Sequence, residues 1–283
     1  MKAYHYTSGQ GLFGILNSQE LRCTNLRFMN DPSEEFYFDQ LMKQILEKKG
    51  DKFKSVHDVL FSESYRNAVL SPTERHVVSF SKNGDSLSMW NYYSKGNGYN
   101  LEIDLNKVIE LNTTYDLYVV KVEINYDENQ QIELLEKLIS DFKEKSERFK
   151  EGKIRMKYAI SENEYYEIMG EIDPIEMDYN ERLEELKIAF KHPAYSREEE
   201  VRLIVSEVPG QNEGENVKFR ISNTGIFVSY IPLSLGSCDS VSRITTHPLN
   251  GELHRVGIEE FLKSEHKLKH IEAISSKIPF REV

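Results

Sequence analysis

Four short polar segments, far apart in the sequence, contain the residue types that could carry out chemistry. Residues 4–8 (YHYTS) place His5 between two tyrosines, and residues 30–34 (NDPSE) set carboxylates around a proline. Residues 79–93 hold serines followed by an aromatic run, and residues 198–202 (EEEVR) end on an arginine. Imidazole, carboxylates, hydroxyls and rings are the groups that bind and cleave small polar substrates. These segments are therefore the candidate site.

The last segment predicts the direction of its side chains. Residues 199–208 read as a strand, in which alternate side chains face opposite sides of a sheet. Val201, Leu203 and Val205 then face the core, and Glu200 and Arg202 share the other face. A carboxylate beside a guanidinium stays ionised at neutral pH, so Glu200 is the candidate charged group.

These groups suit cleavage of a glycosidic bond, whose cation-like transition state is stabilised by a nearby carboxylate. His5 lies between Tyr4 and Tyr6 on a predicted strand, so its side chain points opposite to theirs and can hydrogen-bond ribose hydroxyls. If the leaving group is nicotinamide, the ring of Trp90 or Tyr93 can stack on it. Structural roles also stay open for these residues. His5 can be a core or edge histidine, Trp90 and Tyr93 can fill the core, and the glutamates at 198–200 can form the solvated start of a strand.

The hydrophobic periodicity predicts an α+β fold in a single domain, 1–283, with a helical insertion near 129–191. Residues 30–33 read as a turn that caps a helix, with Pro32 at the first helical position. Strands are expected at 2–6, 20–23, 75–81, 100–104, 118–126, 199–208, 216–221, 225–228, 240–245 and 270–274. Helices are expected at 12–17, 34–49, 54–69, 87–93, 129–150, 155–191 and 258–264.

Composition narrows the class of protein. The 283 residues are 39% hydrophobic and 29% charged, with no apolar run long enough for a membrane span and no signal peptide. Cys23 and Cys238 lie far apart, so a reducing cytoplasm is expected rather than a disulfide framework. The eight histidines show no metal-binding spacing, so no metal centre is predicted. The string GQGLFG at 9–14 lacks the acidic partner of a Rossmann site.

The net charge of −11 disfavours a general nucleic-acid coat, but the charge is unevenly spread. Residues 162–185 carry ten acidic residues and one arginine, or −9, and residues 143–157 carry seven basic and three acidic residues, or +4. The blocks are either two solvated helix faces or a partner surface. On the second view the basic block contacts an acceptor's phosphates and the acidic block binds a basic partner such as an antitoxin protein.

Taken in order, the segments resemble the DUF2971 family of bacterial proteins. The resemblance rests on a YHYT strand, a short GILNSQELRCT helix and strand, an NDP.E turn, an FS strand, an MW..Y segment with a nearby glycine, a K…Y..E.E.R element and a closing SKIPFR string. In this chain they stand at 4–7, 14–24, 30–34, 80–81, 89–98, 191–202 and 276–281. Tyr195 occupies a position where tryptophan is expected, and residues 245–248 (TTHP) replace a glycine-proline turn.

That family looks similar to ADP-ribosyltransferases of the His–Tyr–Glu type. The resemblance implies a split, mixed sheet with NAD, the substrate, in the cleft between its halves. It implies Glu200 as the catalytic carboxylate, with Glu198 as a rival, and an effector of a toxin–antitoxin or phage-defence system that modifies a nucleic acid or a protein. The implied NAD-binding residues are His5, Tyr6, Thr7, Ser81, Trp90, Tyr93 and Arg202.

Two alternatives keep the same fold. An RNA 2′-phosphotransferase would need several basic residues around the phosphate, and the first strand and its turn offer only Lys2. A catalytically silent binding or immunity module would need none of the reactive groups. Neither alternative requires a membrane.

Overall fold

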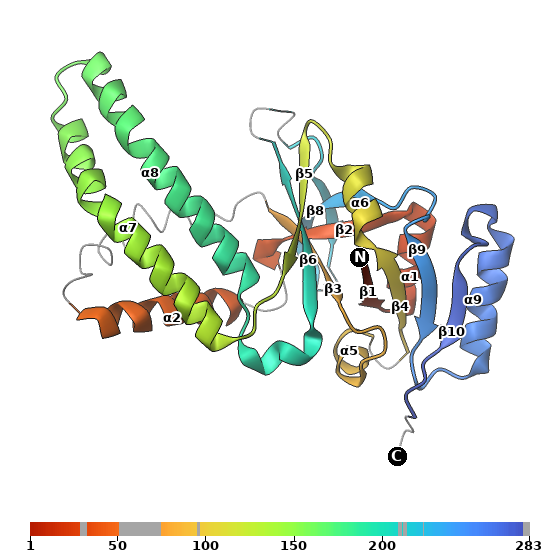
Figure 1. Ribbon diagram of the computed structural model, residues 1–283. Coiled ribbons are helices and arrows are strands. Elements are labelled where there is room, and N and C mark those ends of the chain that lie inside the picture. The colour runs from red at the N-terminus through yellow and green to blue at the C-terminus, as the bar shows by residue number, and fades with distance from the viewer. Residues whose placement is uncertain are drawn as a thin grey trace. The chain divides into compact units, whose positions relative to one another are not determined.

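The computed structural model describes residues 1–28, 33–50, 75–94, 97–208, 211, 214–222 and 224–279. The chain divides into two compact units (Figure 1). The sheet unit contains Met1–Met29, Glu74–Glu123 and Tyr195–Val283, and the helical unit contains Asn30–Thr73 and Ile124–Ala194. Residues 30–32 of the turn expected at 30–33 and the helix expected at 54–69 lie outside the described residues.

The described residues of the sheet unit form a mixed ten-stranded sheet. Its main path runs β10-β9-β4-β1-β3-β2-β8-β7, and β6 joins the sheet beside β3 and carries β5 on its other side. Only β10 and β9 are paired in parallel within the described ladders. The strands are β1 Lys2–Thr7, β2 Glu20–Asn25, β3 His76–Ser81, β4 Tyr99–Asp104, β5 Leu117–Glu123, β6 Glu200–Glu207, β7 Lys218–Ile221, β8 Phe227–Ser234, β9 Val241–Thr246 and β10 Glu272–Ser275.

The sheet divides along one edge of β3. Strand β1 pairs with the end of β3 through Tyr4 and Ser81. Strand β2 pairs with the beginning of β3, where Thr24 lies opposite Val77. Both strands run antiparallel to β3, so they are parallel to each other and are connected by helix α1 (Gly9–Ser18). The middle of β3 therefore lacks a strand partner on this edge, and we call this gap the fork.

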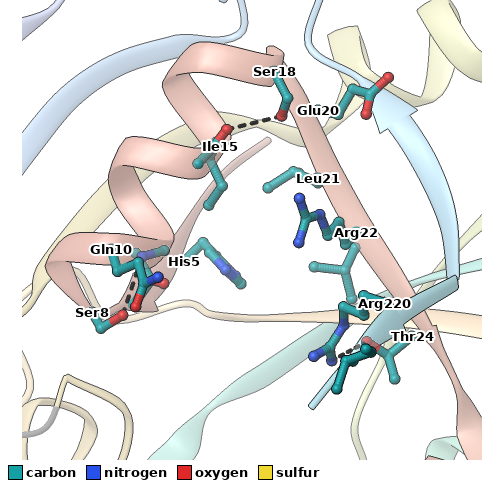
Figure 2. A pocket seen from close by; sticks show the side chains of 15 residues that line it. His5, Ser8, Gln10, Ile15, Ser18, Glu20, Leu21, Arg22, Thr24 and Arg220 are labelled. Atoms are coloured by element: carbon teal, nitrogen blue, oxygen red, sulfur yellow. Dashed lines mark hydrogen bonds between the residues drawn. The ribbon is translucent and has the colours of Figure 1, made fainter. Parts of the chain in front are cut away.

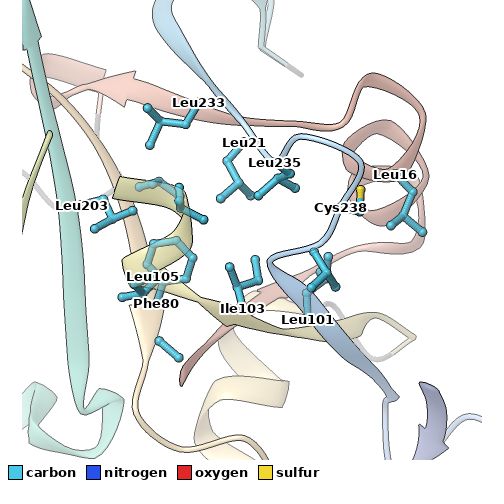
Figure 3. Close-up of a cluster of buried hydrophobic side chains, with 14 of the residues drawn as sticks. Leu16, Leu21, Phe80, Leu101, Ile103, Leu105, Leu203, Leu233, Leu235 and Cys238 are labelled. Atoms are coloured by element: carbon cyan, nitrogen blue, oxygen red, sulfur yellow. The ribbon is translucent and has the colours of Figure 1, made fainter. Parts of the chain in front are cut away.

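The other edge of β3 pairs with β6 along its whole length. Ser79 lies opposite Arg202 and Ser81 lies opposite Glu200, and directly paired residues point to the same face. Val78 and Phe80 point to the opposite face and join the main hydrophobic core, where Figure 3 labels Phe80. The predicted alternation that places Glu200 and Arg202 on one face is therefore confirmed.

Short helices complete the sheet unit. They are η1 (Leu26–Phe28), α5 (Leu87–Tyr93), α6 (Leu105–Asn112), η3 (Pro193–Glu198), α9 (Glu252–Ser264) and η4 (His266–Leu268). Ser8 caps α1 by accepting a 3.1 Å hydrogen bond from the Gly11 amide, as expected of a serine at this position. Leu12 and Leu16, one helical turn apart, fix α1 to the main core.

The helical unit contains α2 (Ser33–Lys49), α7 (Glu128–Lys157) and α8 (Glu162–Ala189). The last two form a long antiparallel hairpin (Figure 1). Buried apolar residues of all three helices make a separate core, which includes Phe38, Ile139, Phe149, Ile172 and Tyr179. The described residues contain no helix that is both long and apolar enough to cross a membrane.

The two charge blocks lie on the two helices of this hairpin. Lys145 pairs with Asp178 at 2.9 Å, and Arg155 pairs with Glu171 at 3.0 Å. In the reverse sense, Arg182 of α8 pairs with Asp141 of α7 at 2.7 Å. Part of the charge segregation therefore serves contacts within the hairpin.

The α+β class is confirmed, and several boundaries differ from expectation. Helix α6 is absent from the prediction; it begins at an Asp104 cap and buries Leu105 and Val108 within only eight residues. Strand β8 extends to Ser234 rather than ending at 228, although it contains Pro232. Strand β7 pairs only with Phe227–Tyr230. The side of β8 that faces β7 therefore has no ladder hydrogen bond at Pro232 that the missing N–H of proline would interrupt.

Candidate functional site

A polar cavity of about 440 Å³ lies at the fork. Strands β1 and β2, helix α1, the centre of β3 and strand β7 contribute to its wall. Its polar lining includes His5, Thr7, Ser8, Gln10, Arg22 and Arg220 (Figure 2). The cavity therefore joins segments that are about two hundred residues apart in the chain.

His5 is held at the fork by the unpaired centre of β3. Its Nδ1 lies 3.0 Å from the carbonyl oxygen of Ser79. A carbonyl only accepts hydrogen bonds, so Nδ1 carries the proton and the Nε2 of a neutral ring is left as an acceptor. Burial lowers the pKa of His5, opposed by the Ser79 hydrogen bond, so the ring is neutral at pH 7. The ring can thus accept a hydroxyl hydrogen bond from a ligand in the cavity.

Two arginines supply positive charge to the same cavity. The described contacts of both are with neutral groups: Arg220 donates to the Thr24 hydroxyl at 3.4 Å, and the Arg22 guanidinium lies 5.3 Å from the centre of the Tyr230 ring. Figure 2 shows both guanidinium groups and the His5 ring around one space. Guanidinium groups bind phosphates and carboxylates through paired N–H donors. The cavity is therefore suited to an anionic ligand with hydroxyl groups.

Helix α1 turns its small residues toward the cavity. Gly11, Gly14 and Ser18, three or four residues apart, all line it. A Cβ on Gly11 would meet the Thr7 hydroxyl at 2.1 Å, whereas a Cβ on Gly14 would meet no atom within 4 Å. Gly14 therefore leaves open space that a ligand can fill.

A second polar cluster surrounds the start of β6. Arg202 donates to both carboxylate oxygens of Glu200, at 2.8 and 3.1 Å, and the two residues are 1% and 5% exposed. Tyr93 donates to the Glu198 carboxylate at 3.0 Å, and Ser81 donates to the Glu198 carbonyl at 2.7 Å. Between the two buried glutamates, Glu199 has a φ of 45°, a strained conformation for a residue with a side chain.

The aromatic candidates pack beside this cluster. Trp90 is fully buried, its indole N–H donates to Asp85 at 2.8 Å, and its ring meets that of Tyr6 edge to face at 4.8 Å. Tyr6 donates to the Asn83 carbonyl at 2.8 Å, and burial raises its pKa. Strand alternation places Tyr6 on the face opposite to His5.

The structure thus brings the nine predicted site residues together in two groups. His5 and Thr7 line the cavity. Glu198, Glu200, Arg202, Ser81, Tyr93, Trp90 and Tyr6 lie in or beside the second cluster. Val78, which lines the cavity, points to the face of β3 opposite to Arg202 and Glu200. The segment 30–32 lies outside the described residues.

Sequence reasoning missed Arg22 and Arg220 as site residues. Each is an isolated arginine in a short strand, and the two are brought near each other by the strand order β2-β8-β7. Local spacing carries no signal for such a pair. Among the described residues, no three His, Cys, Asp or Glu side chains are grouped so that they could hold a metal ion.

Comparison with known families adds one finding. Residues 89–203 match the family described as Protein of unknown function (DUF2971). The matched stretch covers 115 of the 283 residues of the chain. The DUF2971 stretch includes Trp90, Tyr93 and the whole Glu198–Arg202 cluster, whereas His5 and the two cavity arginines lie outside it. Comparisons with curated proteins and with solved structures gave no match.

Proposed function

We propose that this protein is an NAD-dependent ADP-ribosyltransferase that binds NAD in the cavity at the fork. The observation that carries the proposal is the neutral imidazole of His5, fixed by the Ser79 carbonyl, inside a gap in the sheet. By this proposal the mixed sheet is of the split ADP-ribosyltransferase type. The protein would serve as a toxin or defence effector that modifies a nucleic acid or a protein.

The cavity lining fits the chemical groups of NAD. Arg22 and Arg220 would pair with the two phosphates, because their described partners are neutral. His5 Nε2 would accept a ribose hydroxyl, and the hydroxyls of Thr7 and Ser8 lie on the same wall. The open space at Gly14 allows a ligand to approach the backbone of α1.

The transfer breaks the bond between ribose and nicotinamide and forms a bond from the same ribose carbon to a nucleophile of the acceptor. A carboxylate must stabilise the positive charge that develops on the ribose. We propose Glu200 for this role and Glu198 as its rival. Both carboxylates are buried and hold internal partners, Arg202 and Tyr93. Exposure of either carboxylate to the ribose would therefore require a local rearrangement.

Because both carboxylates are already bound to internal partners, a second candidate function is a nucleotide-binding module without catalysis. In such a module the Glu200–Arg202 pair would be purely structural, and the fork cavity would still bind NAD. Arg22 and Arg220, which both line the cavity, also supply the basic groups that a phosphotransferase needs and that the first strand does not provide. The acceptor and the reaction must therefore be tested apart from binding.

Binding is tested by filling the cavity. A Gly14→Leu side chain would occupy the open space, so we expect calorimetric titration with NAD to show at least about a tenfold loss of affinity. Gly257→Leu is the matched control, since Gly257 lies in α9 of the same unit and also has no atom near its Cβ position. Equal affinity in the two variants would place NAD elsewhere or nowhere.

Catalysis is tested with labelled NAD and cell lysate. An ADP-ribosyltransferase moves the label into protein, RNA or DNA, and Glu200→Gln abolishes the transfer while NAD affinity persists. Loss in Glu198→Gln alone would reassign the role to Glu198. NAD binding without any label transfer or nicotinamide release would establish the silent module, and removal of a 2′-phosphate from RNA would establish the phosphotransferase.

A further inference from the structure

The chain that follows β10 is bound to the loop in front of α5, and we call its residues 276–278 the strap. The Ser276 amide donates to the Thr246 carbonyl at 3.2 Å and extends the pairing of β10 with β9. Beyond that point, the Ser276 hydroxyl donates to Asp85 Oδ1 at 2.7 Å and the Lys277 amide donates to Asp85 Oδ2 at 2.9 Å. The strap therefore continues an edge strand and is then held by a single carboxylate.

The same carboxylate holds helix α5. The indole N–H of Trp90 in α5 donates to Asp85 Oδ1 at 2.8 Å. Ile278 of the strap packs against the apolar cluster that includes Trp90. Helix α5 has only seven residues, and the side chain of its N-cap residue, Ser86, makes no capping hydrogen bond. Because so short a helix depends on tertiary contacts, the strap contributes to the position of α5.

Helix α5 in turn holds one of the two candidate carboxylates. Tyr93, the last residue of α5, donates to the Glu198 carboxylate at 3.0 Å. The proposed function requires a rearrangement that exposes Glu198 or Glu200 to the ribose. Since Tyr93 lies on α5 and Glu198 lies before β6, movement of α5 would separate the two side chains.

We propose that the strap is an autoinhibitory latch. While it is bound to Asp85, α5 keeps Tyr93 on Glu198, and release of the strap lets α5 move and frees the Glu198 carboxylate. The inference rests on the proposed function for the role of that carboxylate, and it adds how the site is regulated.

The contacts of the strap are few enough to open. Two of the three hydrogen bonds that the Asp85 carboxylate accepts in the described part of the chain come from the strap, and the third comes from Trp90. Protein hydrogen bonds that exchange with bonds to water contribute only a modest net free energy. Local opening of a segment held by two such bonds and one apolar contact is therefore accessible without unfolding of the sheet unit.

The double variant Ser276→Ala/Ile278→Ala tests the latch, because it removes the hydroxyl bond and most of the apolar contact. Hydrogen exchange followed by mass spectrometry should show about tenfold faster exchange of the α5 amides. Trp90 is the only tryptophan of the chain, so acrylamide quenching of its fluorescence reports the same opening and should increase. The matched control is Leu253→Ala/Ser264→Ala, which removes an 82% exposed side chain and a hydroxyl bond within α9, and it should change neither readout.

Turnover of NAD supplies the functional readout. The rate of nicotinamide release should rise with the open population in the double variant, by up to about tenfold. The rate should stay at its basal level in the α9 control. It should also stay there in Ile278→Leu, which keeps an apolar side chain on the cluster and guards against a general loss of folding.

Three outcomes would overturn the inference. Equal exchange of the α5 amides in the double variant and the α9 control would show that the strap does not hold α5. Faster exchange of α5 without faster nicotinamide release, in a protein that does turn over NAD, would show that opening does not free the site. Absence of NAD binding and of nicotinamide release in every variant would overturn the proposed function and, with it, the regulatory role of the strap, whatever the exchange of α5.

Discussion

The two units of this protein place opposite charges in different environments. In the sheet unit, Glu200 and Arg202 form a doubly hydrogen-bonded pair that is almost fully buried. In the helical unit, Lys145 and Asp178 pair across the surface of the hairpin, where roughly half of each side chain stays in water. The chemical groups are similar, but the surroundings differ.

The two environments differ in how far each charge is desolvated. A buried pair has lost the hydration of both ions, so removal of one partner leaves an uncompensated charge. An exposed pair keeps most of its hydration, and its attraction is screened by water and salt. Burial should therefore determine which charges contribute most to stability, and four measurements test the stability of the two units.

The largest effect is expected from Arg202→Met. The variant leaves the Glu200 carboxylate buried without its partner, and we expect the free energy of unfolding to fall by about 3–5 kcal/mol. Urea unfolding measures the loss, with Lys145→Met as the matched control on the surface. Adding Glu200→Leu to Arg202→Met should restore part of the stability. Equal losses of stability for Arg202→Met and Lys145→Met would show that burial does not set the contribution of these ion pairs.

A smaller effect is expected in the seam of the hairpin. A Cβ on Gly152 would lie 2.2 Å from Ile172 Cγ2, so Gly152→Ala should lower the stability of the helical unit by about 1–3 kcal/mol. Gly170→Ala on α8 meets no atom within 4 Å and should gain up to about 1 kcal/mol through higher helix propensity. Helix-specific circular dichroism during urea unfolding compares the two. A neutral result for Gly152→Ala would mean that apolar contact does not limit the approach of the helices.

The pH dependence of the sheet unit provides the third test. Burial lowers the pKa values of His5 and His247, so the unfolded chain binds more protons once the pH falls below about 6.5. Their contribution to stability is full above that value and is lost as the pH falls through the folded-state pKa values. The urea midpoint should therefore decrease from about pH 7.5 to about pH 5.5, and less so in His5→Gln. The NAD affinity of the unaltered protein should decrease only below about pH 6.5, as the pH falls through the lowered pKa of His5 in the folded protein.

The smallest effect is expected from Asp178→Asn. Loss of the Lys145 contact should cost at most about 1 kcal/mol, and less in high salt. The hydrogen bond from Lys145 lowers the pKa of Asp178, so this stabilisation is full above about pH 3.8 and is lost as the pH falls through the lower folded value. A cost of several kcal/mol, unchanged by salt, would show that exposed and buried pairs contribute alike.

The hydrophobic pattern along the chain predicted most of the local elements that the structure describes, although it missed α6. The period of apolar residues placed α5 at its observed limits, because one helix face must be apolar to pack. Helix α7 extends seven residues beyond its expected end at 150, and α8 begins seven residues after its expected start at 155. Strand alternation placed Glu200 and Arg202 on one face for the same kind of reason. The direction of His5, opposite to Tyr6, also follows from alternation, and His5 does face a cavity.

Which of these residues lie close together depends on the tertiary fold rather than on the local pattern. The fork exists because β1 and β2 pair with opposite ends of β3, and strand order is set by long-range pairing that no local pattern encodes. That order brings Arg22 and Arg220 to the cavity, which neither Glu200 nor Arg202 lines. The two charge blocks are separate along the sequence, but packing of α7 against α8 brings them together as ion pairs. Charges interact through space rather than along the chain, so the sequence pattern alone does not show these pairs.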